Sequence, residues 1–138
     1  MNSPAATTPP APQVLALVKD MIFAVKIVST ARSLGVSCQT VLSVAGLAGA
    51  CAAHQPALII VDLDLPGLDV QALASAVRAV GAHTRVVGYL SHIQVEMAAA
   101  AKAAGIAEVM PRSAFTRNLP ELLQAAGHAT IKAGQPPQ

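Results

Sequence analysis

Acidic residues gather at the end of an apolar run in the stretch ALIIVDLDLPGLDVQ, residues 57–71. Residues 57–61 are continuously apolar, and Asp62, Asp64 and a Pro-Gly turn follow at once. Carboxylates held close together repel one another, and the repulsion costs stability unless a metal ion, a proton or a basic side chain offsets it. Oxygen ligands of this kind suit Mg²⁺. A carboxylate beside such an ion can accept a phosphoryl group if donors bind the remaining phosphoryl oxygens.

Strand and helix patterns alternate along the chain and determine which residues join this acidic group. Apolar runs of strand length predict strands at residues 13–18, 36–42, 57–61, 84–90 and 107–110. Helical spacing of apolar residues predicts helices at residues 21–34, 45–53, 70–80 and 93–105. Asn118 is predicted to cap a last helix that has Pro120 and Glu121 in its first turn and runs toward Ile131. This alternation predicts an α/β fold with a doubly wound parallel sheet in a three-layer sandwich.

The carboxyl ends of the predicted strands bring the chemically useful groups together. In an open parallel sheet the ligand site lies outside those ends, where the winding direction reverses. If the first strand is central and the third lies beside it, the residues that follow these strands share one rim. Two carboxylates and a backbone carbonyl there would be a sufficient protein contribution to a Mg²⁺ site. The ends of the fourth and fifth strands add a hydroxyl and a guanidinium as donors. The residues predicted at these strand ends are Lys19, Asp20, Asp62, Asp64, Ser91 and Arg112.

Composition indicates one globular domain. With 138 residues, of which 54% are hydrophobic and 12% charged, the chain can bury a substantial core. We expect a disordered lead-in at residues 1–12, a domain at 13–131 and a flexible tail at 132–138. The net charge is only +2, the basic residues are scattered, and the aromatic residues number one Tyr, two Phe and no Trp. Direct binding of nucleic acid is therefore not expected.

The sequence also predicts a cytoplasmic protein without a membrane span. Lys19, Asp20 and Lys26 interrupt the apolar stretch at residues 14–28, so that stretch is not expected to cross a bilayer. The N-terminal residues lack the basic start and apolar core of a secretory signal. The two cysteines have no metal-ligand or redox spacing and are interpreted as buried free thiols in a reducing compartment.

The stretch LIIVDLDLPGLD resembles the third-strand signature of response-regulator receiver domains of two-component signalling. The resemblance covers about residues 13–131 and implies a flavodoxin-like (βα)5 fold with a five-stranded sheet in the order 2-1-3-4-5. It also implies that Asp62 is the phosphoacceptor and that Asp64 offers its backbone carbonyl to Mg²⁺. The stretch LALVKDM is similar to the first-strand motif, and its one acid, Asp20, corresponds to a metal ligand.

Two further segments extend the resemblance. GYLSH matches the position of the family's switch Ser/Thr, which implies that role for Ser91. AAGIAEVMPRSAF resembles the segment that carries the family's lysine, and Arg112 stands at the lysine position. The resemblance thus implies a signalling domain, not an enzyme, in which Asp62, Ser91 and Arg112 take part in phosphoryl acceptance.

The departures from the family pattern fall on charges and on an aromatic residue. Lys19 replaces the first acid, a change worth on the order of a few kcal/mol against a divalent ion, so Mg²⁺ binding is expected to be weakened. Arg112 is bulkier than lysine, and Ser113 stands where the family has a proline, so the direction of the arginine is left open. Val109 and Met110 occupy the place of the family's aromatic switch residue.

Two functions therefore compete. In the first, Asp62 accepts a phosphoryl group from a histidine kinase or a small phosphodonor with Mg²⁺, and the fourth-helix face changes its affinity for a downstream protein. In the second, the domain is a pseudo-receiver, in which Lys19 or Arg112 pairs with Asp62 and the fold serves as a protein-binding platform. A stand-alone domain would pass its signal on by docking to another protein or by forming a homodimer. An enzyme of the flavodoxin type is disfavoured, because no Gly-rich phosphate loop is present.

Overall fold

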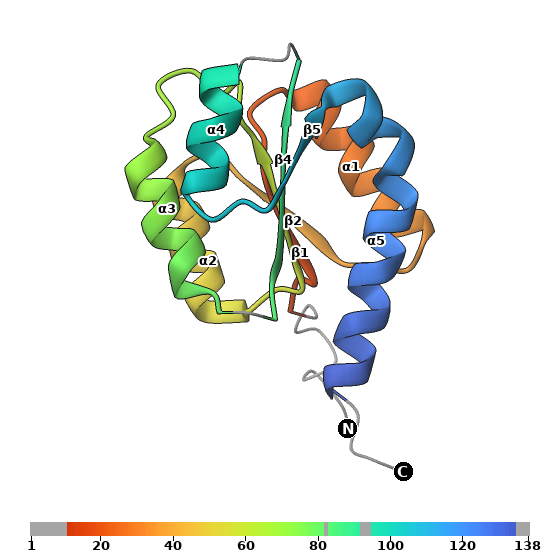
Figure 1. Ribbon diagram of the computed structural model, residues 1–138. Coiled ribbons are helices and arrows are strands. Elements are labelled where there is room, and N and C mark those ends of the chain that lie inside the picture. Colours follow the sequence, from red (N-terminus) through yellow and green to blue (C-terminus); the bar gives the residue numbers. More distant parts are fainter. Residues whose placement is uncertain (1–10, 82, 92–94, 135–138) are drawn as a thin grey trace, which may run out of the picture.

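The computed structural model describes residues 11–81, 83–91 and 95–134. Their strands form one parallel sheet in the order β2-β1-β3-β4-β5 (Figure 1). This topology confirms the flavodoxin-like α/β sandwich predicted from the sequence. The strands are β1 (Val14–Leu17), β2 (Cys38–Val41), β3 (Leu58–Asp62), β4 (Arg85–Leu90) and β5 (Glu108–Pro111).

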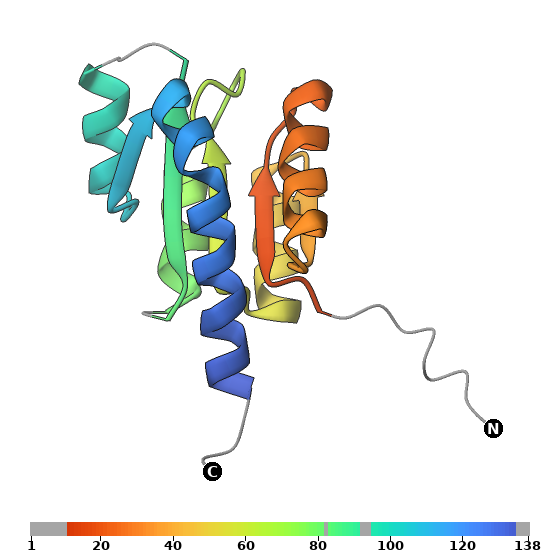
Figure 2. The same ribbon diagram turned by 90° about the vertical axis from the view of Figure 1, so that its right-hand side faces the viewer.

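Helices cover both faces of the sheet. In Figures 1 and 2, α1 and α5 lie on one face, and α2, α3 and α4 lie on the other. Within the described residues, none of these helices is both long and apolar enough to cross a lipid bilayer. The helices are α1 (Met21–Ser33), α2 (Val44–His54), α3 (Val70–Ala79), α4 (Val95–Ala103) and α5 (Arg112–Gly134).

The central strands are buried on both faces, which explains their unbroken apolar sequence. Along β3, Leu58 and Ile60 face the core under α1 and α5, whereas Ile59 and Val61 face the core under the other three helices. All four side chains are fully or almost fully buried. The sheet therefore has two hydrophobic cores and a rigid centre from which Asp62 emerges.

The first and third helices begin at acidic caps that hold the chain next to the sheet edge. One carboxylate oxygen of Asp20 accepts hydrogen bonds from the backbone N–H groups of Ile22 and Phe23, at 3.0 and 3.2 Å. Asp69 caps α3 in the same way. Each cap satisfies helix N–H groups that would otherwise lack a partner.

The predicted start of the last helix was wrong. The helix α5 begins at Arg112, directly after β5, so Asn118 is not its cap and Pro120 lies inside it. Phe115 and Leu119 are spaced one helical turn apart and are both buried against the sheet. Burial of this apolar stripe offsets the lost hydrogen bond and the crowding that an internal proline causes.

Regular structure at the C-terminus reaches past residue 131, the predicted end of the domain. The helix α5 continues to Gly134, so regular structure extends into the tail predicted at residues 132–138. Residues 1–10, which make up most of the predicted lead-in, lie outside the described residues, and so does the start of the helix predicted at 93–105.

Two glycines, one in tightly packed surroundings and one with open space beside it, allow the packing to be tested. A methyl group on Gly88 in β4 would lie 2.8 Å from Cδ1 of Leu63, a side chain that is itself buried. We expect Gly88→Ala to lower the free energy of unfolding by about 1–3 kcal/mol, because the core would have to repack. Nothing lies within 4 Å of the corresponding position on Gly49 in α2, so Gly49→Ala should raise stability by about 0.5–1 kcal/mol. Urea unfolding of both variants measures these changes, and equal effects would contradict the packing.

Candidate functional site

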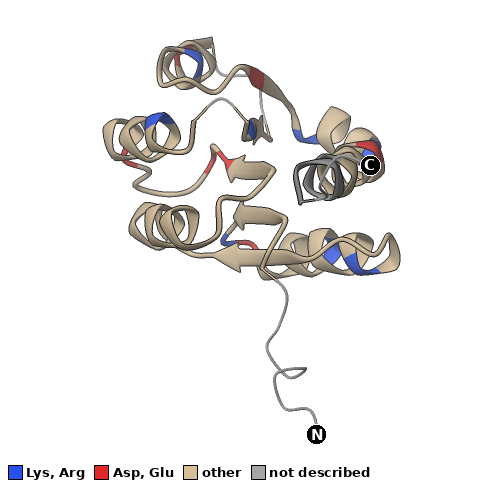
Figure 3. Ribbon diagram, turned by 90° about the horizontal axis from the view of Figure 1, so that it is seen from below, with Lys and Arg blue, Asp and Glu red and all other residues tan. Residues whose placement is uncertain are grey.

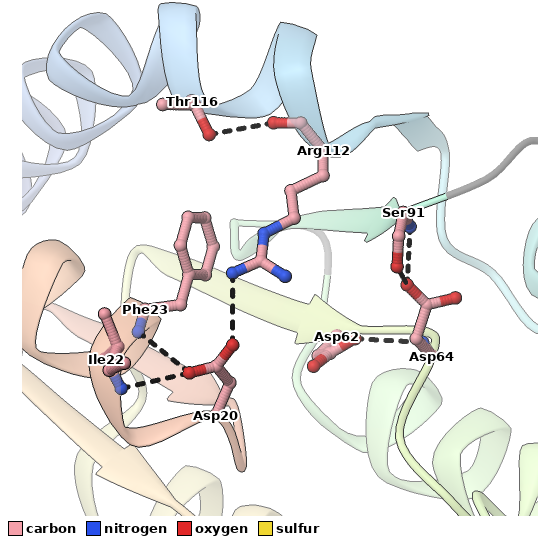
Figure 4. A network of polar contacts seen from close by, with 8 residues as sticks. All are labelled: Asp20, Ile22, Phe23, Asp62, Asp64, Ser91, Arg112 and Thr116. Atoms are coloured by element: carbon pink, nitrogen blue, oxygen red, sulfur yellow. Dashed lines mark hydrogen bonds and ion pairs between the residues drawn. The ribbon is translucent and has the colours of Figure 1, made fainter.

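The predicted site residues lie at the carboxyl edge of the sheet. Asp62 is the last residue of β3, and Arg112 follows β5 directly. Asp20 precedes α1, Asp64 follows β3, and Ser91 follows β4. Figure 4 shows these residues around the end of β3. The structure thus brings Asp20 and Asp62 to one edge, as the strand pattern predicts.

Asp62 is a buried carboxylate with one oxygen left open. Its side chain is 9% exposed, and its Oδ1 accepts a hydrogen bond from the backbone N–H of Asp64 at 2.9 Å. Its other oxygen accepts no hydrogen bond from the described residues. Burial raises the pKa of Asp62, and repulsion from Asp64 and Asp20 acts in the same direction, while the Asp64 N–H and Arg112 oppose it. Asp62 therefore combines a raised proton affinity with an oxygen that is available to a ligand.

Asp20 has partners for both of its oxygens. Oδ1 caps α1, and Oδ2 accepts from Nη2 of Arg112 at 3.3 Å. The backbone N–H of Phe23 and then the Arg112 guanidinium hold the pKa of Asp20 below its ordinary value. The side chain is exposed, so this ion pair by itself adds little stability. Its effect is to position a cation beside the carboxylates.

Arg112 points into the site. Its guanidinium carbon lies 4.0 Å from the centre of the Phe23 ring, within the range of a cation–π interaction. The ring of Phe23 packs edge-on against Tyr89, with centroids 5.2 Å apart, and Tyr89 stacks on Phe115 at 4.7 Å. This aromatic cluster fixes the ring that supports the guanidinium. The direction of Arg112, which the sequence left open, is therefore set by Phe23 and Asp20 together.

Phe23 is a site residue that the sequence analysis missed. It lies three positions after the cap Asp20, and in the sequence it belongs to an apolar helix face. The chain contains two phenylalanines and one tyrosine, and all three meet here. No local signal in the sequence predicts this meeting, because the three rings come from α1, β4 and α5 and are brought together by the fold.

Lys19 is not the cation that acts on the carboxylates. Arg112 is among the charges that lower the pKa of Asp20 and Asp62, and Lys19 is not. Lys19 is exposed and forms no ion pair with the described residues. That Lys19 weakens Mg²⁺ binding stays a prediction, and the cation paired with a carboxylate of the site is Arg112.

Ser91 and Asp64 are paired with each other. Both the backbone N–H and the hydroxyl of Ser91 donate to Oδ2 of Asp64. This pair links the end of β4 to the loop after β3 (Figure 4). The sequence analysis assigned only a backbone carbonyl to Asp64, so its side-chain contact with Ser91 is new. In this state the Ser91 hydroxyl is directed at Asp64 instead of Asp62.

Of the predicted Mg²⁺ ligands, Asp20 has both oxygens engaged, whereas Asp62 keeps one oxygen open. Hard divalent cations take oxygen ligands, and these residues carry carboxylates. Asp20 is paired with Arg112 and the α1 backbone, and the Asp64 carboxylate accepts from Ser91. Among the described residues, no group of three or more His, Cys, Asp or Glu side chains is arranged to hold a metal ion. A divalent cation at this edge would have to compete with Arg112 for the carboxylate of Asp20.

Comparison with solved structures identifies the fold. A signal receiver domain from Mycobacterium tuberculosis is 22% identical and has a TM-score of 0.65, with 86% of this chain and 98% of that chain covered. A response regulator from Burkholderia pseudomallei, solved with a phosphorylated aspartic acid, a calcium ion and citrate, is 15% identical with a TM-score of 0.70 over 89% of this chain and 73% of that chain. The Francisella response regulator 1452 receiver domain is 16% identical, with a TM-score of 0.66 and coverage of 88% and 98%.

These likenesses show that the chain has the receiver-domain fold. Neither protein-family models nor curated protein sequences give a match. At such low identity the shared property is the arrangement of strands and helices, and the role of each residue at the strand ends has to be argued from its own surroundings.

The raised pKa of Asp62 predicts a pH-dependent stability. Asp62→Asn is expected to raise the free energy of unfolding at neutral pH, because a neutral amide avoids the cost of a buried carboxylate. The native state binds this proton at a higher pH than the unfolded chain, whose pKa is near 3.8. The cost is therefore present above the native pKa and disappears as the pH falls through it.

Urea unfolding at neutral and mildly acidic pH measures this difference. The difference in the free energy of unfolding between Asp62→Asn and the wild type should become smaller as the pH is lowered. Asp69→Asn is the matched control, since Asp69 is an exposed helix cap and asparagine caps equally well. A difference in the free energy of unfolding that becomes larger at acidic pH would contradict a raised pKa of Asp62.

Proposed function

We propose that this protein is a receiver-like signalling domain that accepts a phosphoryl group on Asp62 from a histidine kinase or a small phosphodonor. The observation that supports this best is the state of the Asp62 carboxylate. It is buried at the sheet edge, yet one of its oxygens has no hydrogen-bond partner among the described residues. The Arg112 guanidinium, which could have blocked it, is paired with Asp20.

The proposed step is a transfer to the open oxygen of Asp62. This oxygen attacks the phosphorus of the donor and forms a P–O bond. The bond between phosphorus and the donor's leaving group breaks, and the leaving group departs with the bonding electrons. The product is an acyl phosphate whose remaining oxygens need cationic and hydrogen-bond donors. Candidates for these donors are the Ser91 hydroxyl, after β4, and the Arg112 guanidinium, after β5.

The acyl phosphate would change the contacts of the resting site. A phosphoryl group brings negative charge and strong acceptor oxygens, so it competes with Asp20 for Arg112 and with Asp64 for Ser91. Movement of Ser91 away from Asp64 would break the link between the end of β4 and the loop after β3. The signal would then reach a downstream protein, or a second copy of the chain, as a change in affinity.

A phosphorylation-independent platform is the second candidate. The observation in its favour is that the resting site is already balanced, because Arg112 pairs with Asp20 and Ser91 pairs with Asp64. In that function the same fold binds a partner protein without any adduct. In both candidate functions the protein acts in the cytoplasm and binds neither a membrane nor nucleic acid. Neither function involves enzymatic turnover of a substrate.

The distribution of basic residues is the reason that this proposal includes no nucleic-acid partner. Figure 3 shows Lys and Arg distributed over several elements, without a continuous stripe along one helix. Nucleic-acid binding by the phosphate backbone requires such a concentration of positive charge.

Incubation with acetyl phosphate separates the two candidates. We expect intact-protein mass spectrometry to find one phosphoryl group on the wild type, removable by hydroxylamine as an acyl phosphate is. Asp62→Asn should carry none, because the amide oxygen is a poor nucleophile. Asp69→Asn, the exposed control, should be modified like the wild type. An unmodified wild type would favour the platform, and an adduct that survives in Asp62→Asn would exclude Asp62 as the acceptor.

A further inference from the structure

The fixed position of Arg112 leads to an inference about the cation of this site, which rests on the proposed function. We infer that the Arg112 guanidinium takes the place of a divalent metal ion, so that phosphoryl acceptance on Asp62 is independent of metal. The inference starts from the donor set. A metal at this edge would need oxygens of Asp20, and both of them already have protein partners.

The guanidinium is held by Asp20 and Phe23 at the start of α1, a part of the chain that is distant from Arg112 in the sequence. Arg112 and Asp20 are 92 residues apart, and the ring of Phe23 lies 4.0 Å below the guanidinium. Phe23 is 5% exposed and is itself fixed by Tyr89. Arg112 also needs no loop to reach the site, because it follows β5 immediately. The cation is therefore part of the folded structure before any phosphodonor binds.

The charge of Arg112 reaches both acids of the site. It lowers the pKa of Asp20 and also opposes the rise in the pKa of Asp62. A divalent ion placed between these carboxylates would be repelled by the guanidinium at short range. The fold thus supplies one positive charge beside the carboxylates that would bind a metal, and this charge acts against a second cation.

A guanidinium is chemically suited to the task. It is planar, remains charged at any physiological pH, and offers several N–H donors in a fork that matches phosphoryl oxygens. When acetyl phosphate reacts, the Asp62 oxygen forms the new P–O bond and acetate leaves with the electron pair of the old one. The phosphoryl oxygens can then replace the Asp20 carboxylate as the acceptors of hydrogen bonds from the Arg112 N–H groups. No metal ion is needed for this exchange.

Mn²⁺ titration tests the inference without phosphorylation. By isothermal titration calorimetry with Mn²⁺ as the probe, we expect the wild type to bind no more tightly than Asp62→Asn. Arg112→Gln should bind on the order of tenfold tighter than the wild type, because the repelling charge is gone and Asp20 is released. Adding Asp20→Asn to Arg112→Gln should abolish the gain. Arg117→Gln, an exposed arginine on the same helix, is the matched control and should behave like the wild type.

A second measurement follows the reaction itself. In excess EDTA, the wild type should be modified by acetyl phosphate within about twofold of its rate with Mg²⁺, whereas Arg112→Gln should lose about tenfold or more and recover in part when Mg²⁺ is added. Arg112→Met keeps an unbranched apolar stem without the charge and serves as the second variant if Arg112→Gln shows a reduced thermal midpoint.

The results that overturn the inference are distinct from those that overturn the proposed function. Tight Mn²⁺ binding by the wild type that Asp62→Asn abolishes and Arg112→Gln leaves unchanged would show an ordinary metal site. A gain of Mn²⁺ binding in Lys19→Gln but not in Arg112→Gln would show that the wrong cation was chosen. If the wild type is never phosphorylated, the proposed function fails, and the Mn²⁺ titration still decides whether Arg112 stands in for the metal.

Discussion

The structure depends on the burial of a negative charge at the edge of a parallel sheet. Parallel pairing places Leu17 opposite Val61 and Asp62 opposite Tyr89, so the chain leaves each central strand at the same edge and the acids that follow must share one environment. Asp62 has little access to solvent, and its charge has to be offset from within the protein. The Asp64 backbone N–H and the Arg112 guanidinium provide that offset.

The hydrophobic core is in direct contact with the polar edge of the sheet. The three aromatic rings fill the core between the sheet and the two helices on that face, and the outermost ring, that of Phe23, carries the guanidinium. A change in the packing of α1 or α5 would therefore be felt as a change in the position of a charge. The packing of α1 and α5 on the sheet is therefore linked to the chemistry at the carboxyl edge of the sheet. The link consists of side-chain contacts between the aromatic rings and the Arg112 guanidinium.

Local sequence patterns predicted the fold well because the strands are short, continuously apolar runs and the helices begin at recognisable caps such as Asp20 and Asp69. They failed for α5, where the local signal of Pro120 was outweighed by burial of Phe115 and Leu119, a tertiary effect. Asp62 could be found because it ends a buried strand. The pairing of Arg112 with Phe23 and Asp20 could not, because it joins opposite ends of the chain and depends on the angle at which α5 leaves the sheet.

The two outermost strands of the sheet have a consequence for how the molecule meets other chains. The strands β2 and β5 each span four residues, and β5 ends on a proline, which has no N–H group to donate. A sheet margin this short offers few open backbone groups to an incoming strand, and natural proteins use such brevity to avoid polymerising edge to edge. Growth into fibrils through the sheet margins is thereby discouraged.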